Sequence, residues 1–190
     1  MNQHSPPRPV SPSSSPTGLV LVYTGDGKGK TTAAFGLALR AAGRGFRVHV
    51  IQFIKGEMET GEVEMITKAL PLITVERVGK GFTWRRDVVP TFEDHVAAAR
   101  EGFSRAREAV TGGSYQVVIL DELNVALKKK LLPVEDVVAL LDARPVSLHL
   151  VLTGRGAPPE ILDRADLVTE MRCVRHPFSQ GIPAQVGIDR

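Results

Sequence analysis

The fold of this chain is decided by the stretch LVLVYTGDGKGKTT, residues 19–32. An apolar run leads into a loop with a glycine at every second position, and Gly-Lys-Thr-Thr then opens an alanine-rich stretch typical of a helix. A strand, a glycine loop and a helix in this order are the pattern of a phosphate-binding P-loop. Backbone N–H groups of such a loop form an anion-binding nest, to which the helix N-terminus adds partial positive charge. The stretch therefore predicts that the chain binds a nucleoside triphosphate.

The spacing of this loop departs from the standard P-loop. The standard pattern has a glycine five residues before the glycine of the Gly-Lys pair, where this chain has Thr24, and Gly25 comes one residue late. Gly25, Gly27 and Gly29 still allow close backbone approach and positive φ angles. A glycine-rich turn without a ligand is the alternative, but the order of strand, Gly-Lys-Thr-Thr and helix favours a P-loop that holds its phosphates in an unusual way.

Length and composition describe an ordinary globular chain. Its 190 residues suit one domain, and 43% hydrophobic and 24% charged residues are typical values. No apolar run approaches the ~20 residues that span a bilayer, and no signal-peptide core opens the chain. The single cysteine, Cys173, fits a reducing compartment. We therefore expect a cytoplasmic protein, and a net charge of +3 gives no reason to expect nucleic acid or a membrane as partner.

The chain divides into an N-terminal arm and one domain. Residues 1–17 are rich in proline and serine and have no acidic residue, so we expect a disordered arm. Residues 18–190 alternate apolar strand patterns with helical patterns, which predicts an α/β domain with a single doubly wound, mostly parallel sheet of the P-loop NTPase (RecA-like) type. Predicted strands are 19–24, 46–54, 73–78, 115–121, 147–153 and 167–172, and predicted helices are 30–42, 92–110, 133–142 and 158–164. Ligands are expected at the carboxyl ends of the strands.

An acidic pair closes another apolar strand pattern, VVILDE at 117–122. An apolar strand that ends in a carboxylate is the Walker B pattern, in which the carboxylate binds Mg²⁺ directly or through water. Acidic residues here could instead cap a helix, but the P-loop upstream favours the metal site. Which of Asp121 and Glu122 touches the metal stays open at this point.

Two further segments carry chemical interest. The segment GKGFTWRR at 79–86 holds Phe82 and the only tryptophan, Trp84; these aromatic rings could stack on a flat ligand, although composition alone favours simple packing. Arg155 stands in TGRG at 153–156, after a predicted strand, where it could meet phosphates or acidic groups.

Together these segments resemble the P-loop type of ATP:corrinoid adenosyltransferase, over essentially all of residues 18–190. The segments that carry the resemblance are YTGDGKGKTTAAFG at 23–36, VIQFIKG at 50–56, GFTW at 81–84, VVILDELN at 117–124, LTGRG at 152–156 and GIPAQVGID at 181–189. Asp26 departs from the asparagine of many relatives.

The resemblance implies a reaction and a set of substrates. The 5′-deoxyadenosyl group of ATP would move to the Co(I) centre of a reduced corrinoid, with release of triphosphate, in adenosylcobalamin biosynthesis or salvage. The cobalt is the nucleophile, so no catalytic serine, cysteine or histidine is needed. ATP is then a co-substrate, lying reversed relative to other P-loop proteins, and Mg²⁺, or Mn²⁺ in its place, is the cofactor.

Residue roles follow from the same resemblance. The loop from Gly25 to Lys30, with Lys28 and Lys30, would hold the triphosphate. Thr31 and Glu122 would bind the metal, with Asp121 as an outer or alternate ligand. Two further contacts are implied, from Thr32 to a phosphate and from Arg40 to the nucleotide.

Phe82 and Trp84 match aromatic residues that meet the lower face of the corrinoid. By excluding the lower axial ligand they would leave cobalt four-coordinate and easier to reduce by a flavoprotein. The family also suggests a homodimer and an N-terminal arm that folds over the corrinoid, but it does not indicate which corrinoid is used. Three alternatives remain: a RecA-like ATPase that acts on nucleic acid, a small-molecule kinase, and a non-catalytic corrinoid carrier.

Overall fold

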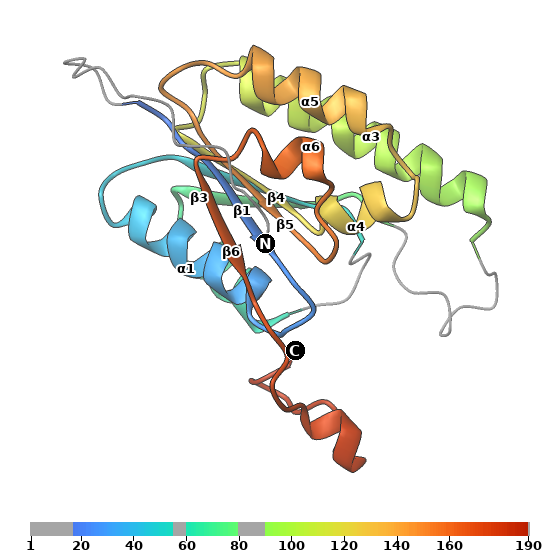
Figure 1. Cartoon of the computed structure of the whole chain (residues 1–190). Coiled ribbons are helices and arrows are strands. Elements are labelled where there is room, and N and C mark those ends of the chain that lie inside the picture. The colour runs from blue at the N-terminus through green and yellow to red at the C-terminus, as the bar shows by residue number, and fades with distance from the viewer. Residues whose placement is uncertain (1–16, 55–59, 80–89, 190) are drawn as a thin grey trace.

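The computed structural model describes residues 17–54, 60–79 and 90–189. Within them, six parallel strands form one sheet with the order β3-β2-β4-β5-β1-β6 (Figure 1). The strands are β1 (Val20–Thr24), β2 (Val48–Gln52), β3 (Ile73–Arg77), β4 (Val117–Asp121), β5 (His149–Thr153) and β6 (Leu167–Glu170). The predicted α/β class and parallel sheet are confirmed, and every observed strand lies inside a predicted range.

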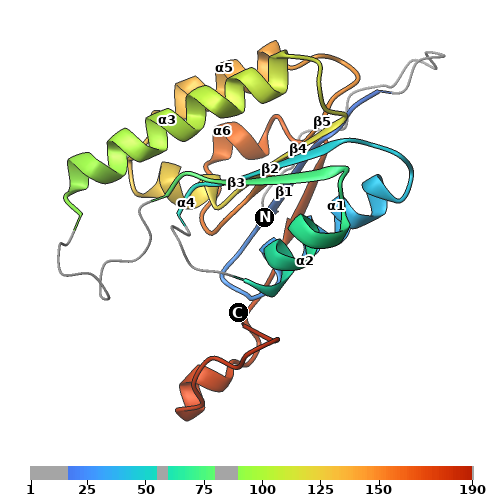
Figure 2. The ribbon, with the colours of Figure 1, turned by 180° about the vertical axis from the view of Figure 1, so that it is seen from behind.

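Helices cover both faces of this sheet (Figures 1 and 2). One face carries α1 and α2, while α3, α5 and α6 lie on the other. The helices are α1 (Lys30–Ala42), α2 (Gly61–Ala69), α3 (Phe92–Thr111), α4 (Leu123–Lys128), α5 (Val134–Ala143) and α6 (Pro159–Leu162), followed by the 3₁₀ turn η2 (Pro177–Gln180). The central strands are buried because both of their faces are covered, which explains their nearly continuous apolar sequences.

The sequence prediction missed two helices, α2 and α4. Helix α4 has only six residues and begins directly after Glu122, whose backbone takes the left-handed conformation with φ 62°. Such a short segment does not establish a helical period. The predicted arm at 1–17 lies outside the described residues except for Thr17, and so do Phe82 and Trp84. Among the helices that the structure describes, none combines the length and the apolar character needed to cross a membrane.

The strand register aligns polar residues at the carboxyl edge of the sheet. Gln52 of β2 pairs with Asp121 of β4, and the pairing of Leu120 with Leu152 puts Thr153 of β5 beside Asp121. Side chains of paired residues in neighbouring parallel strands point to the same face of the sheet. Gln52, Asp121 and Thr153 therefore form a row on one face, and all three are fully buried.

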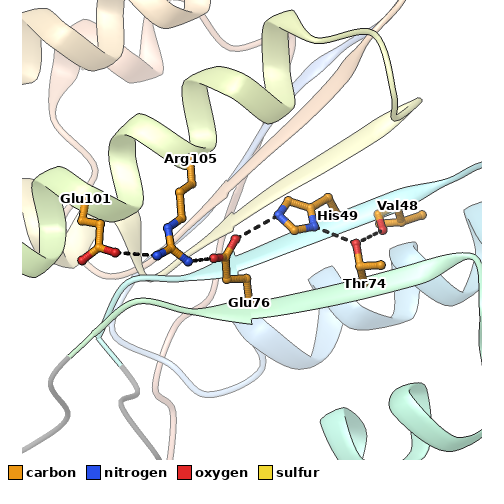
Figure 3. Close-up of polar contacts among 6 residues, drawn as sticks. All are labelled: Val48, His49, Thr74, Glu76, Glu101 and Arg105. Carbon is orange, nitrogen blue, oxygen red and sulfur yellow. Dashed lines mark hydrogen bonds and ion pairs between the residues drawn. The ribbon is translucent and has the colours of Figure 1, made fainter.

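On the other face of the sheet, a polar cluster surrounds His49 of β2 (Figure 3). Its Nδ1 lies 2.7 Å from the Thr74 hydroxyl, and its Nε2 lies 3.5 Å from a Glu76 carboxylate oxygen. Glu76 also pairs with Arg105 of α3, which pairs in turn with Glu101. The His49 ring stacks on Tyr115 with a centroid distance of 4.9 Å. Burial lowers the pKa of His49 below its usual value.

This pKa shift predicts a loss of stability at acidic pH. A histidine whose pKa is lowered in the folded state takes up its proton first in the unfolded state, so its contribution is complete above the unfolded pKa of about 6.5 and declines as pH falls below it. Replacing His49 with glutamine should flatten the fall in unfolding free energy between about pH 7 and 5, measured by urea denaturation. Glu76→Gln is the control: it leaves the imidazole buried, so the slope should persist. A slope that His49→Gln leaves unchanged would contradict burial as its cause.

Candidate functional site

The P-loop joins the end of β1 to the start of α1 at the carboxyl edge of the sheet. Gly25 has φ 90°, and a Cβ atom there would lie 2.4 Å from the Met171 carbonyl oxygen, so only glycine fits. Gly29, the residue before α1, is also left-handed, and no side chain caps the helix. The first turn of α1 contains no acidic residue. Its N-terminal N–H groups and partial positive charge therefore form a favourable anion site.

Lys30 lies under this loop. Its side chain is buried, and Nζ donates hydrogen bonds to the carbonyl oxygens of Gly25, at 2.9 Å, and Gly27, at 2.5 Å. Burial lowers the pKa of Lys30, and the nearby Arg155 guanidinium lowers it further. The carboxylates of Glu122, Asp26 and Asp121 act in the opposite direction. The side chain of Lys30 therefore interacts electrostatically with Arg155 and with all three acidic residues.

The Asp121 carboxylate is the centre of the buried polar row. The Thr31 hydroxyl donates to Oδ1 at 2.9 Å, the Thr153 hydroxyl donates to Oδ1 at 2.7 Å, and the Gln52 amide donates to Oδ2 at 2.9 Å. These three neutral donors come from α1, β5 and β2. Asp121 thereby ties the first turn of the P-loop helix to two strands of the sheet.

The oxygen groups around Thr31 fit a hard divalent cation. The Thr31 hydroxyl gives its hydrogen to Asp121, and a hydroxyl oxygen that donates its hydrogen presents lone pairs, the kind of group that binds a cation. Glu122 is half-buried beside Asp121, and its N–H donates to the Thr153 hydroxyl at 3.0 Å. Hydroxyl and carboxylate oxygens without nitrogen or sulfur are the donor set that Mg²⁺ prefers. Within residues 17–54, 60–79 and 90–189, no group of three or more histidine, cysteine or acidic side chains is placed so that it could hold a metal ion by itself.

The outer wall of the P-loop is formed by the chain that follows β6. The Gly27 N–H donates to the Met171 carbonyl at 2.7 Å, and the Cys173 N–H donates to Asp26 Oδ1 at 3.2 Å. Further along the chain, Asp189 Oδ1 lies 2.6 Å from Lys28 Nζ. In this arrangement the Gly27 N–H faces the C-terminal segment, so the anion nest does not include every amide of the loop.

Thr24, which stands where the standard motif has glycine, links the P-loop to the segment after β6 and to the turn after β5. Its carbonyl accepts from the Met171 N–H at 2.9 Å, and its hydroxyl accepts from the Ala157 N–H at 3.2 Å. The second bond connects the P-loop to the turn after β5, which carries Arg155. A glycine at this position would keep only the first of these bonds.

The remaining predicted site residues lie at different distances from the loop. Thr32 is exposed in the first turn of α1, and Arg155 is exposed in the turn after β5. Arg40 lies in the last turn of α1, where its charge acts on Tyr23. Arg40 lies ten positions after Lys30 in the helix, about 15 Å away along its axis at 1.5 Å per residue. The structure thus gathers the loop, Asp121, Glu122 and Arg155, whereas Arg40 lies at the other end of α1.

Gln52, Thr153 and the C-terminal wall were not predicted as site residues. Gln52 and Thr153 each end an apolar strand with a polar side chain, as Asp121 does. That signal becomes specific only when the strand order places β2 and β5 on either side of β4. The fully buried Asn124, whose amide donates to the Gly154 carbonyl at 3.3 Å, supports the turn after β5 in a similar way.

Comparison with known proteins shows the family of this chain. The model of the family ATP:corrinoid adenosyltransferase BtuR/CobO/CobP matches residues 16–189. The corrinoid adenosyltransferase of Pseudomonas aeruginosa is 41% identical over 172 residues, covering 90% of this chain and 83% of that protein. The corrinoid adenosyltransferase of Escherichia coli strain K12 is 42% identical over 172 residues, covering 90% of this chain and 85% of that protein.

A solved structure shows the same fold at much lower identity. The flagellar accessory protein FlaH from Methanocaldococcus jannaschii superposes with a TM-score of 0.54 at 13% identity, covering 82% of this chain and 72% of that one. This likeness concerns the fold alone, and it agrees with the α/β fold and parallel sheet that the sequence predicts. The family match over nearly the whole chain and the close relatives identify the activity: this chain belongs to the corrinoid adenosyltransferase family and is a transferase of that kind.

Proposed function

We propose that this chain transfers the 5′-deoxyadenosyl group of ATP to the Co(I) centre of a reduced corrinoid. The cobalt electron pair attacks the ribose 5′ carbon, a cobalt–carbon bond forms, and the carbon–oxygen bond breaks. Triphosphate leaves with the electron pair of the broken carbon–oxygen bond. The observation that carries the proposal is the uncapped N-terminus of α1, with the buried Lys30 and the Thr31–Asp121 pair beside it, in a chain of this family.

Stabilisation of the leaving triphosphate is the main task of the P-loop in this reaction. Negative charge on the bridging oxygen grows as the carbon–oxygen bond breaks, so donors aimed at the phosphates lower the barrier. Lys30 and Lys28 supply positive charge, the loop N–H groups and Thr32 supply donors, and Arg155 adds a guanidinium from the turn after β5. Lys30 exchanges its carbonyl partners Gly25 and Gly27 for phosphate oxygens when the nucleotide binds.

Thr31 and Glu122 hold Mg²⁺ in this proposal, and Mn²⁺ could replace it because it accepts the same oxygen ligands. Asp121 acts through Thr31, since it accepts the threonine hydrogen and so directs the oxygen lone pairs away from itself. When bound, the metal neutralises charge on the phosphate chain. Arg40 can contact the nucleotide only if the bound ATP extends along α1. Such a placement of ATP agrees with the reversed orientation that the resemblance suggests.

The corrinoid half of the site rests on the family resemblance. Phe82 and Trp84 press on the lower face of the corrinoid, exclude the axial ligand and leave cobalt four-coordinate. A reduced flavoprotein then supplies the electron that makes Co(I). We further propose a cytoplasmic homodimer with an N-terminal arm, residues 1–17, that covers the bound corrinoid.

The reaction is tested by incubating the protein with MgATP and chemically reduced cob(I)alamin or cobinamide without oxygen. The proposal expects a light-sensitive adenosylcorrinoid, detected by its absorption spectrum before and after illumination. A protein that binds both ligands but leaves the corrinoid spectrum unchanged would be a carrier, and the proposal would be wrong.

Replacing Lys30 with alanine should slow the chemical step strongly. Loss of one preorganised group that stabilises developing charge lowers kcat by about 10²–10³. The measurement is kcat for adenosylation of Co(I) corrinoid at saturating MgATP. Lys68→Ala is the matched control, because Lys68 is an exposed residue of α2 that pairs with Glu64. Full activity in Lys30→Ala would contradict the proposed role.

Replacing Trp84 with alanine should separate reduction from transfer. Without the aromatic wall the axial ligand stays bound, so activity that starts from Co(II) with a reduced flavoprotein should fall far more than activity that starts from Co(I). Rates from both starting states are compared in one preparation. Equal losses would show that Trp84 acts in some other way.

Replacing Asp189 with asparagine should tighten ATP binding. The carboxylate neutralises part of the charge of Lys28, and both side chains are partly exposed, so the effect is modest. We expect a decrease in the Kd for ATP of up to about fivefold at low ionic strength, which disappears in ~1 M salt. Weaker binding in Asp189→Asn would show instead that Asp189 holds Lys28 in its productive position.

A further inference from the structure

Gln52 is fully buried at the carboxyl end of β2, where it meets the Asp121 carboxylate. The strand register pairs these two residues directly, and the Phe53 N–H donates to the Asp121 carbonyl at 3.0 Å. Backbone and side chain of this part of β2 are therefore both fixed against Asp121. Gln52 is neither a residue of the P-loop nor one of the predicted metal ligands.

The orientation of the Gln52 amide follows from the chemistry of its partner. An ionised carboxylate only accepts hydrogen bonds, so the amide must turn its NH₂ group toward Asp121 Oδ2, at 2.9 Å. Its carbonyl oxygen, Oε1, is buried and has no hydrogen-bond partner among the residues that the structure describes. Burying an amide oxygen without a hydrogen-bond partner costs free energy of folding. This cost indicates that the NH₂ group of Gln52, which contacts Asp121, has a functional role.

The role of the Gln52 NH₂ group is to fix the rotation of the Asp121 carboxylate about its Cβ–Cγ bond. With Oδ2 held by Gln52, Oδ1 is directed toward the hydroxyls of Thr31 and Thr153. If Oδ2 were released, the carboxylate could turn about its Cβ–Cγ bond and lose its alignment with Thr31. The Thr31 hydrogen would then no longer be held away from the metal.

We propose that Gln52 is a positioning residue of the nucleotide site, which acts through Asp121 on Thr31 and so sets the affinity for the metal of the bound nucleotide. This inference rests on the proposed function, since it assigns the metal to Thr31. Residues that orient a metal ligand from outside the ligand set contribute about 10–100-fold in metal affinity. A glutamine is suited to the role, because its neutral amide adds no charge beside Asp121.

The test variant is Gln52→Met, which keeps the length of the side chain but removes the donor. The first measurement is binding of a fluorescent ATP analogue to the free protein as Mg²⁺ is titrated. We expect the Mg²⁺ concentration at half-saturation to rise by about tenfold or more. The second measurement is adenosylation of Co(I) corrinoid, in which the Mg²⁺ requirement should shift equally while the KM for corrinoid stays unchanged.

Two controls separate positioning from general damage to the sheet. Val50→Ala removes buried volume from the same face of β2, two residues earlier, without touching Asp121. It should lower thermal stability but leave the Mg²⁺ dependence as in the parent. Gln52→Asn keeps an amide but withdraws it by one methylene, so it should also require more Mg²⁺, and it carries the test if Gln52→Met does not fold.

The inference is overturned if folded Gln52→Met or Gln52→Asn binds the nucleotide with the Mg²⁺ dependence of the parent. It is also overturned if Val50→Ala shifts that dependence as much, since a structural role would then suffice. Failure of the proposed function looks different. If the parent protein forms no adenosylcorrinoid, the proposed reaction is refuted. If the Gln52→Met variant nevertheless needs more Mg²⁺ than the parent to bind the nucleotide, the positioning role is still supported.

Discussion

The Asp121 carboxylate is the group on which the arrangement of the site depends. It lies fully buried at the end of a central strand and accepts hydrogen bonds from Thr31, Thr153 and Gln52. A buried charge is stable only when neighbouring dipoles replace the water that it has lost. Here those dipoles come from three separate elements, so satisfying one charge also fixes the start of α1 against the sheet. The anion-binding helix terminus and the oxygen groups beside it are thereby held in one place.

A second constraint comes from the C-terminal part of the chain. Strand β6 is an edge strand that pairs only with β1 among the described strands, and the residues after it run along the P-loop. The Thr24 carbonyl accepts a bond from this segment, as a glycine carbonyl also could, and its hydroxyl accepts one from the turn after β5, so the departure from standard glycine spacing adds the second link. Figure 1 shows the last residues extending from this edge away from the body of the sheet. Asp189 nevertheless reaches Lys28, which makes the distant end of the chain part of the loop's electrostatic environment.

Much of this fold could be predicted from the sequence, because its signals are local. The apolar strands, the Gly-Lys-Thr turn and the acid pair each appear within about ten consecutive residues. Gln52 and Thr153 could not be predicted as site residues, since their role depends on the strand order, which brings β2 and β5 beside β4. The role of Met171 and Asp189 depends in the same way on β6 pairing with β1. Arg40 shows the opposite case: a family pattern suggests a contact, while helix geometry places the residue far from Lys30.

The central claim is that this site holds a triphosphate as a leaving group and does not cleave it. The most direct measurement is identification of the phosphate product by ³¹P NMR during turnover with ATP and Co(I) corrinoid. The account predicts one intact triphosphate for each adenosyl group transferred, because the carbon–oxygen bond at the ribose is the only bond of ATP that breaks. ADP and orthophosphate, with no change at cobalt, would contradict it and would assign the P-loop to an ATPase or a kinase.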